Sequence, residues 1–418
     1  MLYALHEAAY YAALPLRIGA DAARAFWSSP LNPASHTESG RTLFAAADLL
    51  SNLTRRYGKP EWRIDEVEVG NRMVPVEMDT VWSSPWVKLQ RFRRAGQGEA
   101  PKVLIVAPLS GHHATLLRGT AKGFLQDHEV YVTDWSNARD VPIYEGRFDF
   151  HDFVDHVRAM LTEIGPNTHV VAVCQPGPPV LTAAALMAED KDPNRPASMV
   201  FMGSPIDARL SPTVTNKMAE TRPFTWFQAY MIHTVPTPYL GAMRRVYPGF
   251  VQLYSFMSMN EKLHMDAHWR YFEDLVKDDG DGAAKHREFY DEYLSVLDLT
   301  EEFYLQTIDI VFQKYLLPKG ELVHRGRRVD TRAISDIALM TVEGAHDDIS
   351  GVGQTQAAHA LCPNIPEEMK ELYVHPDVGH YGVFNGSKFR RDIYPRIRDF
   401  IRAAESSAAE RSSAREAA

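Results

Sequence analysis

Short apolar runs rich in β-branched residues alternate with stretches of helical spacing through much of this chain. The apolar runs cover 103–107, 129–135, 168–173 and 198–202. The helical stretches follow them at about 115–126, 150–164 and 178–189. This alternation predicts a parallel sheet with helices on both faces. Two earlier runs, 62–78 and 86–92, suit the first hairpin of a mixed sheet.

The regular alternation stops after residue 204, and the next clear strand is 334–342. A gap of this length must carry structure of its own. Its many aromatic and methionine residues predict a large, mainly helical cap, inserted after the sixth strand. The pattern then resumes with a helix near 353–361, a strand at 371–374, a loop at 376–386 and a helix near 387–404.

Both ends of the chain differ from this core. Residues 1–30 and 41–56 have helical spacing, whereas 405–418 contain only Ala, Ser, Glu and Arg, which predicts disorder. The predicted organisation is a helical segment at 1–60, the first part of the core at 61–204, the cap at 205–333, the second part of the core at 334–404, and the tail.

Composition excludes several classes of protein. A net charge of −9 and a pI near 6.0 argue against a nucleic-acid binder. Two cysteines exclude a disulfide scaffold and a Cys-rich zinc site, and they fit a reducing, cytoplasmic setting. We expect no membrane span, because no apolar run is long enough, and no secretory leader, because the N-terminus lacks a basic region.

Cys174 carries the most specific chemical signal. It lies between the strand run 168–173 and a helix that starts near Pro178, which is the strand–turn–helix arrangement of a nucleophile elbow. The N-terminus of that helix would favour the thiolate. Pro176 stands where a glycine is usual in such elbows. A buried structural cysteine at a strand end is the alternative interpretation.

A carboxylate and a histidine follow Cys174 in the order that α/β-hydrolases use. Asp347 and Asp348 come after a strand, and either one can orient a histidine or cap a helix; we favour Asp347 as the orienting residue. His380 lies between Gly379 and Gly382 in the loop after the last strand. His375 is its competitor, but it stands at the strand end before a proline. The order Cys, Asp, His predicts an α/β-hydrolase fold and covalent acyl transfer.

The remaining site predictions concern the oxyanion and the substrate. The N–H of Gln175 should be one oxyanion donor, and Leu109 or Ser110 should supply the other, a choice that the sequence leaves open. Trp226, Met257 and Trp269 of the cap are candidates for contact with a hydrophobic substrate, although such residues are more often core. We predict neither a metal nor another cofactor, because the pair His112–His113 has no accompanying ligand motif.

With these residues identified, the chain resembles the intracellular poly(3-hydroxybutyrate) depolymerases of the cysteine type. The resemblance rests on Val173-Cys174-Gln175-Pro176, on Asp347-Asp348-Ile-Ser-Gly and on Gly379-His380-Tyr-Gly. It implies that Cys174 is the nucleophile, Asp347 the triad acid and His380 the base. The proline after the elbow is the pattern of this family.

The resemblance also implies an activity and a setting. It points to ester hydrolysis of short-side-chain polyhydroxyalkanoate at cytoplasmic storage granules, without a cofactor. The alternatives are a polyhydroxyalkanoate synthase-like or coenzyme A-dependent acyltransferase, which shares the covalent intermediate, and a non-catalytic granule-binding protein. An exposed apolar cap would also favour a homodimer.

Overall fold

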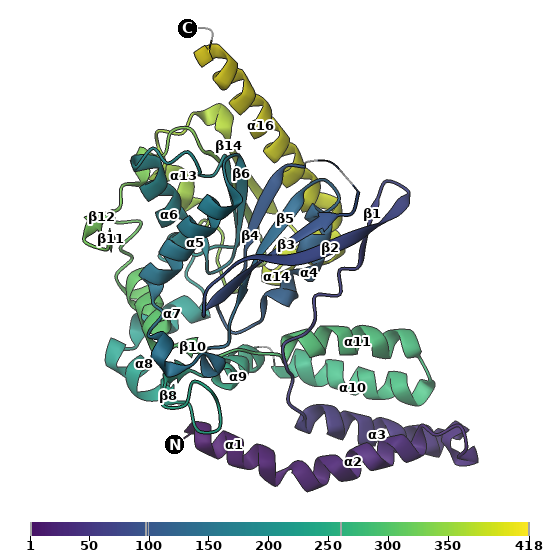
Figure 1. The fold of residues 1–418 in the computed structure, drawn as a ribbon. Helices are drawn as coiled ribbons and strands as arrows, with labels where there is room; N and C mark the ends of the chain where they lie inside the picture. Colours follow the sequence, from purple (N-terminus) through teal and green to yellow (C-terminus); the bar gives the residue numbers. More distant parts are fainter. Residues whose placement is uncertain (1, 97, 99, 260, 417–418) are drawn as a thin grey trace.

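A nine-stranded sheet forms the centre of the computed structural model, which describes residues 2–96, 98, 100–259 and 261–416 (Figure 1). The strand order is β1-β2-β3-β5-β4-β6-β7-β13-β14. The strands are β1 (Glu66–Val69), β2 (Arg72–Ser83), β3 (Val87–Arg94), β4 (Lys102–Val106), β5 (Glu129–Trp135), β6 (Thr168–Val173), β7 (Ser198–Met202), β13 (Ala338–Gly344) and β14 (Lys370–His375). The pairs from β5 to β14 are all parallel, and those from β1 to β5 are antiparallel.

Helices cover both faces of the sheet, with α5 (Phe150–Ile164) and α6 (Gly177–Glu189) on one face and α4 (Arg118–Phe124) and α16 (Tyr394–Glu416) on the other (Figure 1). The central parallel strands are buried, and all residues of β6 and β7 are inaccessible, whereas the edge strand β14 is partly exposed. Such two-sided burial explains their near-continuous apolar sequence. The fold is that of an α/β-hydrolase, which confirms the predicted class.

The opening strands differ from the prediction. The predicted single run 62–78 is a hairpin in which β1 pairs with β2, and Val69 pairs with Arg72 across Gly70 and Asn71. Gly70 has a φ of +60°, which glycine adopts at no steric cost. A Gly-Asn pair between two runs of strand-forming residues is a known hairpin signal, so the sequence contained the information to predict this turn.

The chain between β7 and β13 forms the cap, and most of it is helical. Its helices are α7 (Val214–Thr221), α8 (Phe224–Tyr230), α9 (Gly249–Met259), α10 (Glu261–Lys277), α11 (Gly280–Tyr293) and α12 (Glu301–Thr307), which continues into a π-helix over Ile308–Gln313. The cap also contains short strands: β8 (His233–Thr234), β9 (Arg245–Tyr247) and β10 (Leu299–Thr300) form a small sheet, and β11 (Val323–His324) pairs with β12 (Arg327–Arg328).

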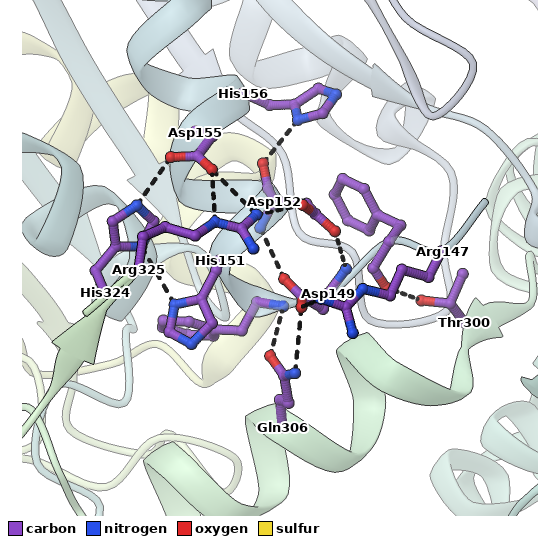
Figure 2. Close-up of polar contacts among 12 residues, drawn as sticks. Arg147, Asp149, His151, Asp152, Asp155, His156, Thr300, Gln306, His324 and Arg325 are labelled. Atoms are coloured by element: carbon purple, nitrogen blue, oxygen red, sulfur yellow. Dashed lines mark hydrogen bonds and ion pairs between the residues drawn. The ribbon is translucent and has the colours of Figure 1, made fainter. Parts of the chain in front are cut away.

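A polar cluster fastens the last part of the cap to the core (Figure 2). His324 Nε2 lies 2.8 Å from Asp155 Oδ1 of α5, and His324 Nδ1 lies 3.2 Å from His151 Nδ1. Arg325 pairs with Asp152 and with Asp155. This cluster holds the β11–β12 hairpin against α5.

The chain ends lie at opposite ends of the molecule (Figure 1). Helices α1 (Leu2–Ala12), α2 (Leu14–Trp27) and α3 (Glu38–Thr54) pack beside the cap. At the other end, α16 continues to Glu416, so residues 405–416 of the predicted disordered tail are helical; residues 417–418 lie outside the described residues. Within the described part of the chain, no helix is long and apolar enough to cross a membrane.

Candidate active site

Cys174 occupies a sharp turn between β6 and α6. Its φ is +65°, a left-handed conformation that non-glycine residues rarely adopt. The Cys174 N–H donates to Met202 O at 2.8 Å, and Gly177 N–H donates to Cys174 O at 3.2 Å, which closes the turn. Strained backbone of this kind clusters at functional sites. The geometry is that of a nucleophile elbow.

Gly177 allows the turn to pack closely on the neighbouring strand end. A Cβ placed on Gly177 would lie 2.5 Å from Ser204 Cβ, closer than side chains approach. Pro176 occupies the position where a glycine is usual in such elbows. Gly177, one residue later, is the glycine that lets the turn pack closely against Ser204. From Gly177 onward α6 runs for 13 residues, with its positive N-terminal end next to the turn.

Asp347 lies in a tightly held loop after β13. Its Oδ1 accepts hydrogen bonds from the N–H groups of Ile349 (2.9 Å) and Ser350 (2.7 Å). The buried carboxylate of Glu343 fixes the far side of the loop, because it accepts from the N–H groups of Gly353 and Thr355. The second oxygen of Asp347 is thereby directed away from the loop.

His380 begins α14 (His380–Phe384), and its Nδ1 lies 2.8 Å from Asp347 Oδ2. Both side chains are almost inaccessible, at 4% and 0% exposure. Burial by itself would lower the pKa of His380, but Cys174 and Asp347, through their charges and hydrogen bonds, raise it well above the ordinary value. The structure therefore brings Cys174, His380 and Asp347 together from three strand ends.

Gly203 makes room for the His380–Asp347 pair. Its φ is +55°, and a Cβ there would lie 3.2 Å from both Asp347 Oδ2 and His380 Cε1. A side chain at this position would press on the hydrogen bond itself.

The two competing residues lie elsewhere. Asp348 is exposed. His375 ends β14, its Nε2 lies 3.2 Å from Asp392 Oδ2, and its Nδ1 accepts from Asp377 N–H at 3.1 Å. Both ring nitrogens of His375 are thus engaged away from Cys174.

The turn after β4 approaches Cys174 from the other side. Leu109 N–H, one of the two candidate oxyanion donors, donates instead to the side-chain oxygen of Gln175 at 3.1 Å. Across the described residues, Ser110 N–H and Gln175 N–H have no hydrogen-bond partner. The Nε2 of Gln175 is buried and also unpartnered within that part of the chain. The Gln175 side chain therefore ties the elbow to this turn.

The two histidines of the same turn are kept uncharged. Burial lowers the pKa of His112 to about 4, although a hydrogen bond to Tyr293 O opposes the shift. Burial, with nearby Lys59 and Arg139, lowers the pKa of His113 to about 3. No group of three metal-ligating side chains is found within the ranges that the structure describes.

The three predicted substrate contacts lie on three different cap helices. Trp226 of α8 packs in a small apolar cluster with Phe227, and Arg222 stacks over its ring at 5.2 Å. Met257 of α9 is half-buried. Trp269 of α10 is 64% exposed and donates to Glu273 at 2.9 Å. No ring contact or hydrogen bond joins these described side chains to Cys174, so their role stays a prediction.

Sequence reasoning missed Tyr381, which follows His380. Burial, with Tyr293 and Cys174 nearby, raises the pKa of Tyr381 far above its ordinary value. Its ring lies 5.8 Å from that of His380 and 6.4 Å from that of Tyr293. The signal was available, because Tyr381 stands inside the Gly-His-Tyr-Gly segment.

Comparison with solved structures gives distant similarities to esterases and other hydrolases. A thermophilic esterase from Thermogutta terrifontis is 14% identical with a TM-score of 0.41, covering 79% of this chain and 98% of its own. The α/β hydrolase GrgF from Penicillium sp. sh18 is 16% identical with a TM-score of 0.45, covering 79% and 99%. A soluble variant of monoglyceride lipase from Saccharomyces cerevisiae is 11% identical with a TM-score of 0.47, covering 81% and 98%. Comparison with curated proteins gives no match.

A family model carries more information than these distant structures. The model described as "PHB de-polymerase C-terminus" matches residues 203–405. The matched range begins after Cys174 and includes the cap, Asp347 and His380. This match to the C-terminal region of PHB de-polymerases, together with the fold, supports a PHB depolymerase-type α/β-hydrolase family.

Proposed function

We propose that this protein hydrolyses ester bonds of poly(3-hydroxybutyrate) or a related short-side-chain polyhydroxyalkanoate, with Cys174 as nucleophile. The observation that carries the proposal is the position of His380, between the Cys174 thiol and the Asp347 carboxylate. The match of residues 203–405 to the PHB de-polymerase C-terminus supports ester hydrolysis and this class of polymer.

The first half of the reaction transfers an acyl group to sulfur. The thiolate of Cys174 attacks the ester carbonyl carbon, a C–S bond forms, and the carbonyl electron pair moves onto oxygen. When this intermediate collapses, the ester C–O bond breaks, and the leaving alkoxide takes a proton from His380. Asp347 holds the imidazole with Nε2 directed at the reacting atoms, and its charge stabilises the imidazolium.

The second half releases the acid. His380, now neutral, removes a proton from water as the water attacks the thioester carbonyl. The C–S bond breaks, and the Cys174 thiolate leaves next to the protonated His380. The resting ion pair is thereby restored, which agrees in direction with the raised pKa of His380.

The oxyanion requires two donors, and the free N–H groups of Gln175 and Ser110 are our first choice. Leu109 N–H can serve only if the Gln175 side chain releases it. A substrate carbonyl that displaces Gln175 Oε1 would gain Leu109 as a donor. The preference for Ser110 therefore follows from a hydrogen bond that already occupies its neighbour.

The test uses purified protein and amorphous poly(3-hydroxybutyrate) granules. We expect release of soluble 3-hydroxybutyrate acids, and an acid-quenched reaction should yield a peptide containing Cys174 that carries one or more 3-hydroxybutyryl units. Absence of both the acids and the adduct contradicts the proposal. Growth of insoluble polymer from 3-hydroxybutyryl-coenzyme A would instead favour a synthase-like transferase.

A further inference from the structure

Helices α1 and α2 turn two of their charged residues inward and most of their apolar residues outward, the reverse of an ordinary surface helix. Glu7 and Arg17 are each only 9% exposed. Glu7 accepts from Arg56 and from the Tyr239 hydroxyl, and Arg17 donates to Thr54 O at 2.6 Å. The helices are thus attached to the rest of the molecule by their polar residues.

The outward side is mostly apolar, although the side chains of Asp21 and Arg24 in α2 are 46% and 41% exposed. Apart from His6, the most exposed residues of 2–27 are apolar. Burial against its surroundings lowers the pKa of His6, whose ring stacks on Phe250 at 4.0 Å, so His6 is neutral at neutral pH. The large side chains of this surface, here called the outer face, are Leu2, Leu5, Tyr11, Leu14, Leu16, Ile18 and Phe26, each between 38% and 59% exposed.

The charged residues at the edge of the outer face are already paired. Asp21 accepts from Ser51 at 2.6 Å, and Arg24 lies 3.5 Å from Asp48. A contiguous apolar surface of this kind on a soluble protein marks an interaction site. Because it offers neither a free cation nor a free anion, it does not suit a nucleic acid or an anionic membrane, both of which require basic residues.

The inner side of α1 is linked to the candidate active site through hydrogen bonds of Tyr3, Asp298 and Leu297. Tyr3, on the inner side of α1, donates to the buried Asp298 at 2.7 Å. Asp298 also accepts from Gly249 N–H at 2.8 Å, and the preceding residue, Leu297, donates to Gly111 O at 2.8 Å. Gly111 belongs to the turn that carries Leu109 and Ser110. Figure 1 shows α1 at the same end of the molecule as α9 and α10.

We propose that the outer face adsorbs this protein to the surface of a neutral aliphatic polyester granule. This inference rests on the proposed function, which supplies the polymer. An amorphous polymer surface has no fixed pattern of donors and acceptors, so apolar contact is what can hold a protein on it. Helices of 11 and 14 residues provide an extended apolar strip about 35–40 Å long at 1.5 Å per residue, suited to a surface rather than to one bound chain.

The test replaces three exposed residues of the outer face with glutamate: Leu5→Glu, Leu16→Glu and Ile18→Glu together. The matched control places the same three charges at similarly exposed apolar positions outside the outer face, with Met73→Glu, Met78→Glu and Leu372→Glu. Both triple variants also carry Cys174→Ala for the binding assay, so that adsorption is measured without turnover. The readout is the fraction that sediments with amorphous poly(3-hydroxybutyrate) granules.

We expect the outer-face variant to bind granules at least about tenfold more weakly than the control, which should bind like the parent protein. In the presence of Cys174, both should hydrolyse a soluble short ester at the parent rate, which also reports correct folding. Equal granule binding by the two variants overturns the proposal. So does a parent dimer that the outer-face charges dissociate, or equally tight binding to neutral phosphatidylcholine vesicles. Adsorption without any ester hydrolysis would overturn the proposed function and leave this inference standing.

Discussion

The two cysteines of this chain have the same side chain and opposite surroundings. Cys174 is half-buried on a left-handed turn beside His380. Cys362 is fully buried at the end of α13 (Ala357–Leu361), where burial, partly opposed by Lys370, raises its pKa to about 12. Burial favours the neutral thiol at Cys362, whereas Cys174 lies beside a histidine whose pKa is raised.

The comparison teaches that local partners, more than position in the chain, decide what a thiol can do. Both residues contact the main apolar core. Only Cys174 stands where a backbone turn, a helix N-terminus and a titratable ring meet. Substitution of the thiols and of their neighbours can therefore test this contrast.

The largest expected effect comes from removing each thiol in turn. Cys174→Ala should lower kcat on granules by a factor of about 10⁴ or more, because removing the nucleophile of a triad removes most of its rate enhancement. Cys362→Ala should leave kcat within about twofold, since that residue touches none of the triad. Acid release per enzyme per minute measures both. Substantial activity in Cys174→Ala would exclude the covalent mechanism.

The second prediction compares the two neighbouring carboxylates. Asp347→Asn should lower kcat by about 10²–10⁴, because an amide no longer stabilises the imidazolium or fixes the tautomer of His380. Asp348→Asn should change kcat by less than about threefold, since its side chain is exposed. Steady-state kinetics on a soluble short ester measures the pair. Reversal of the two effects would assign the acid to Asp348.

The alternation of strands and helices along the chain, the mainly helical cap and the triad candidates were predicted from sequence, because each depends on local pattern. Apolar runs separated by helices define the parallel sheet, and Cys174, Asp347 and His380 each follow a strand run. What could not be predicted depends on contacts between distant segments. Tertiary packing determines the hydrogen bond from Leu109 to Gln175. It also determines the inward orientation of Glu7 and Arg17. Neither feature produces a periodic pattern in the sequence.

The third prediction uses pH to test the pairing of Cys174 with His380. Because the pKa of His380 is raised, its proton is fully bound below about 6.5, the ordinary value, and is lost only as the pH rises through the raised value. In a Cys362→Ala background, alkylation by iodoacetamide should therefore change little between pH 6 and pH 8. With His380→Gln added, alkylation at pH 6 should slow about tenfold or more and should rise steeply with pH, as for a free thiol.

The control for this experiment is Cys362 itself. In a Cys174→Ala background, Cys362 should react only after unfolding in urea, because it is inaccessible. A steep pH dependence of alkylation in the protein that retains both Cys174 and His380 would show that the histidine does not hold the thiolate.

The smallest expected effect concerns stability. Here substitution of Cys362 should matter more than substitution of Cys174. Cys362→Ser should lower the free energy of unfolding by about 1–3 kcal/mol, because a hydroxyl replaces an apolar thiol in a closed core. Cys174→Ser should cost less than about 1 kcal/mol, since that side chain is half-buried beside polar groups. Urea unfolding at pH 7, followed by circular dichroism, measures both. If Cys174→Ser were the more destabilising change, the Cys174 thiol would contribute more to packing than the Cys362 thiol does. That result would contradict the difference in burial between the two side chains.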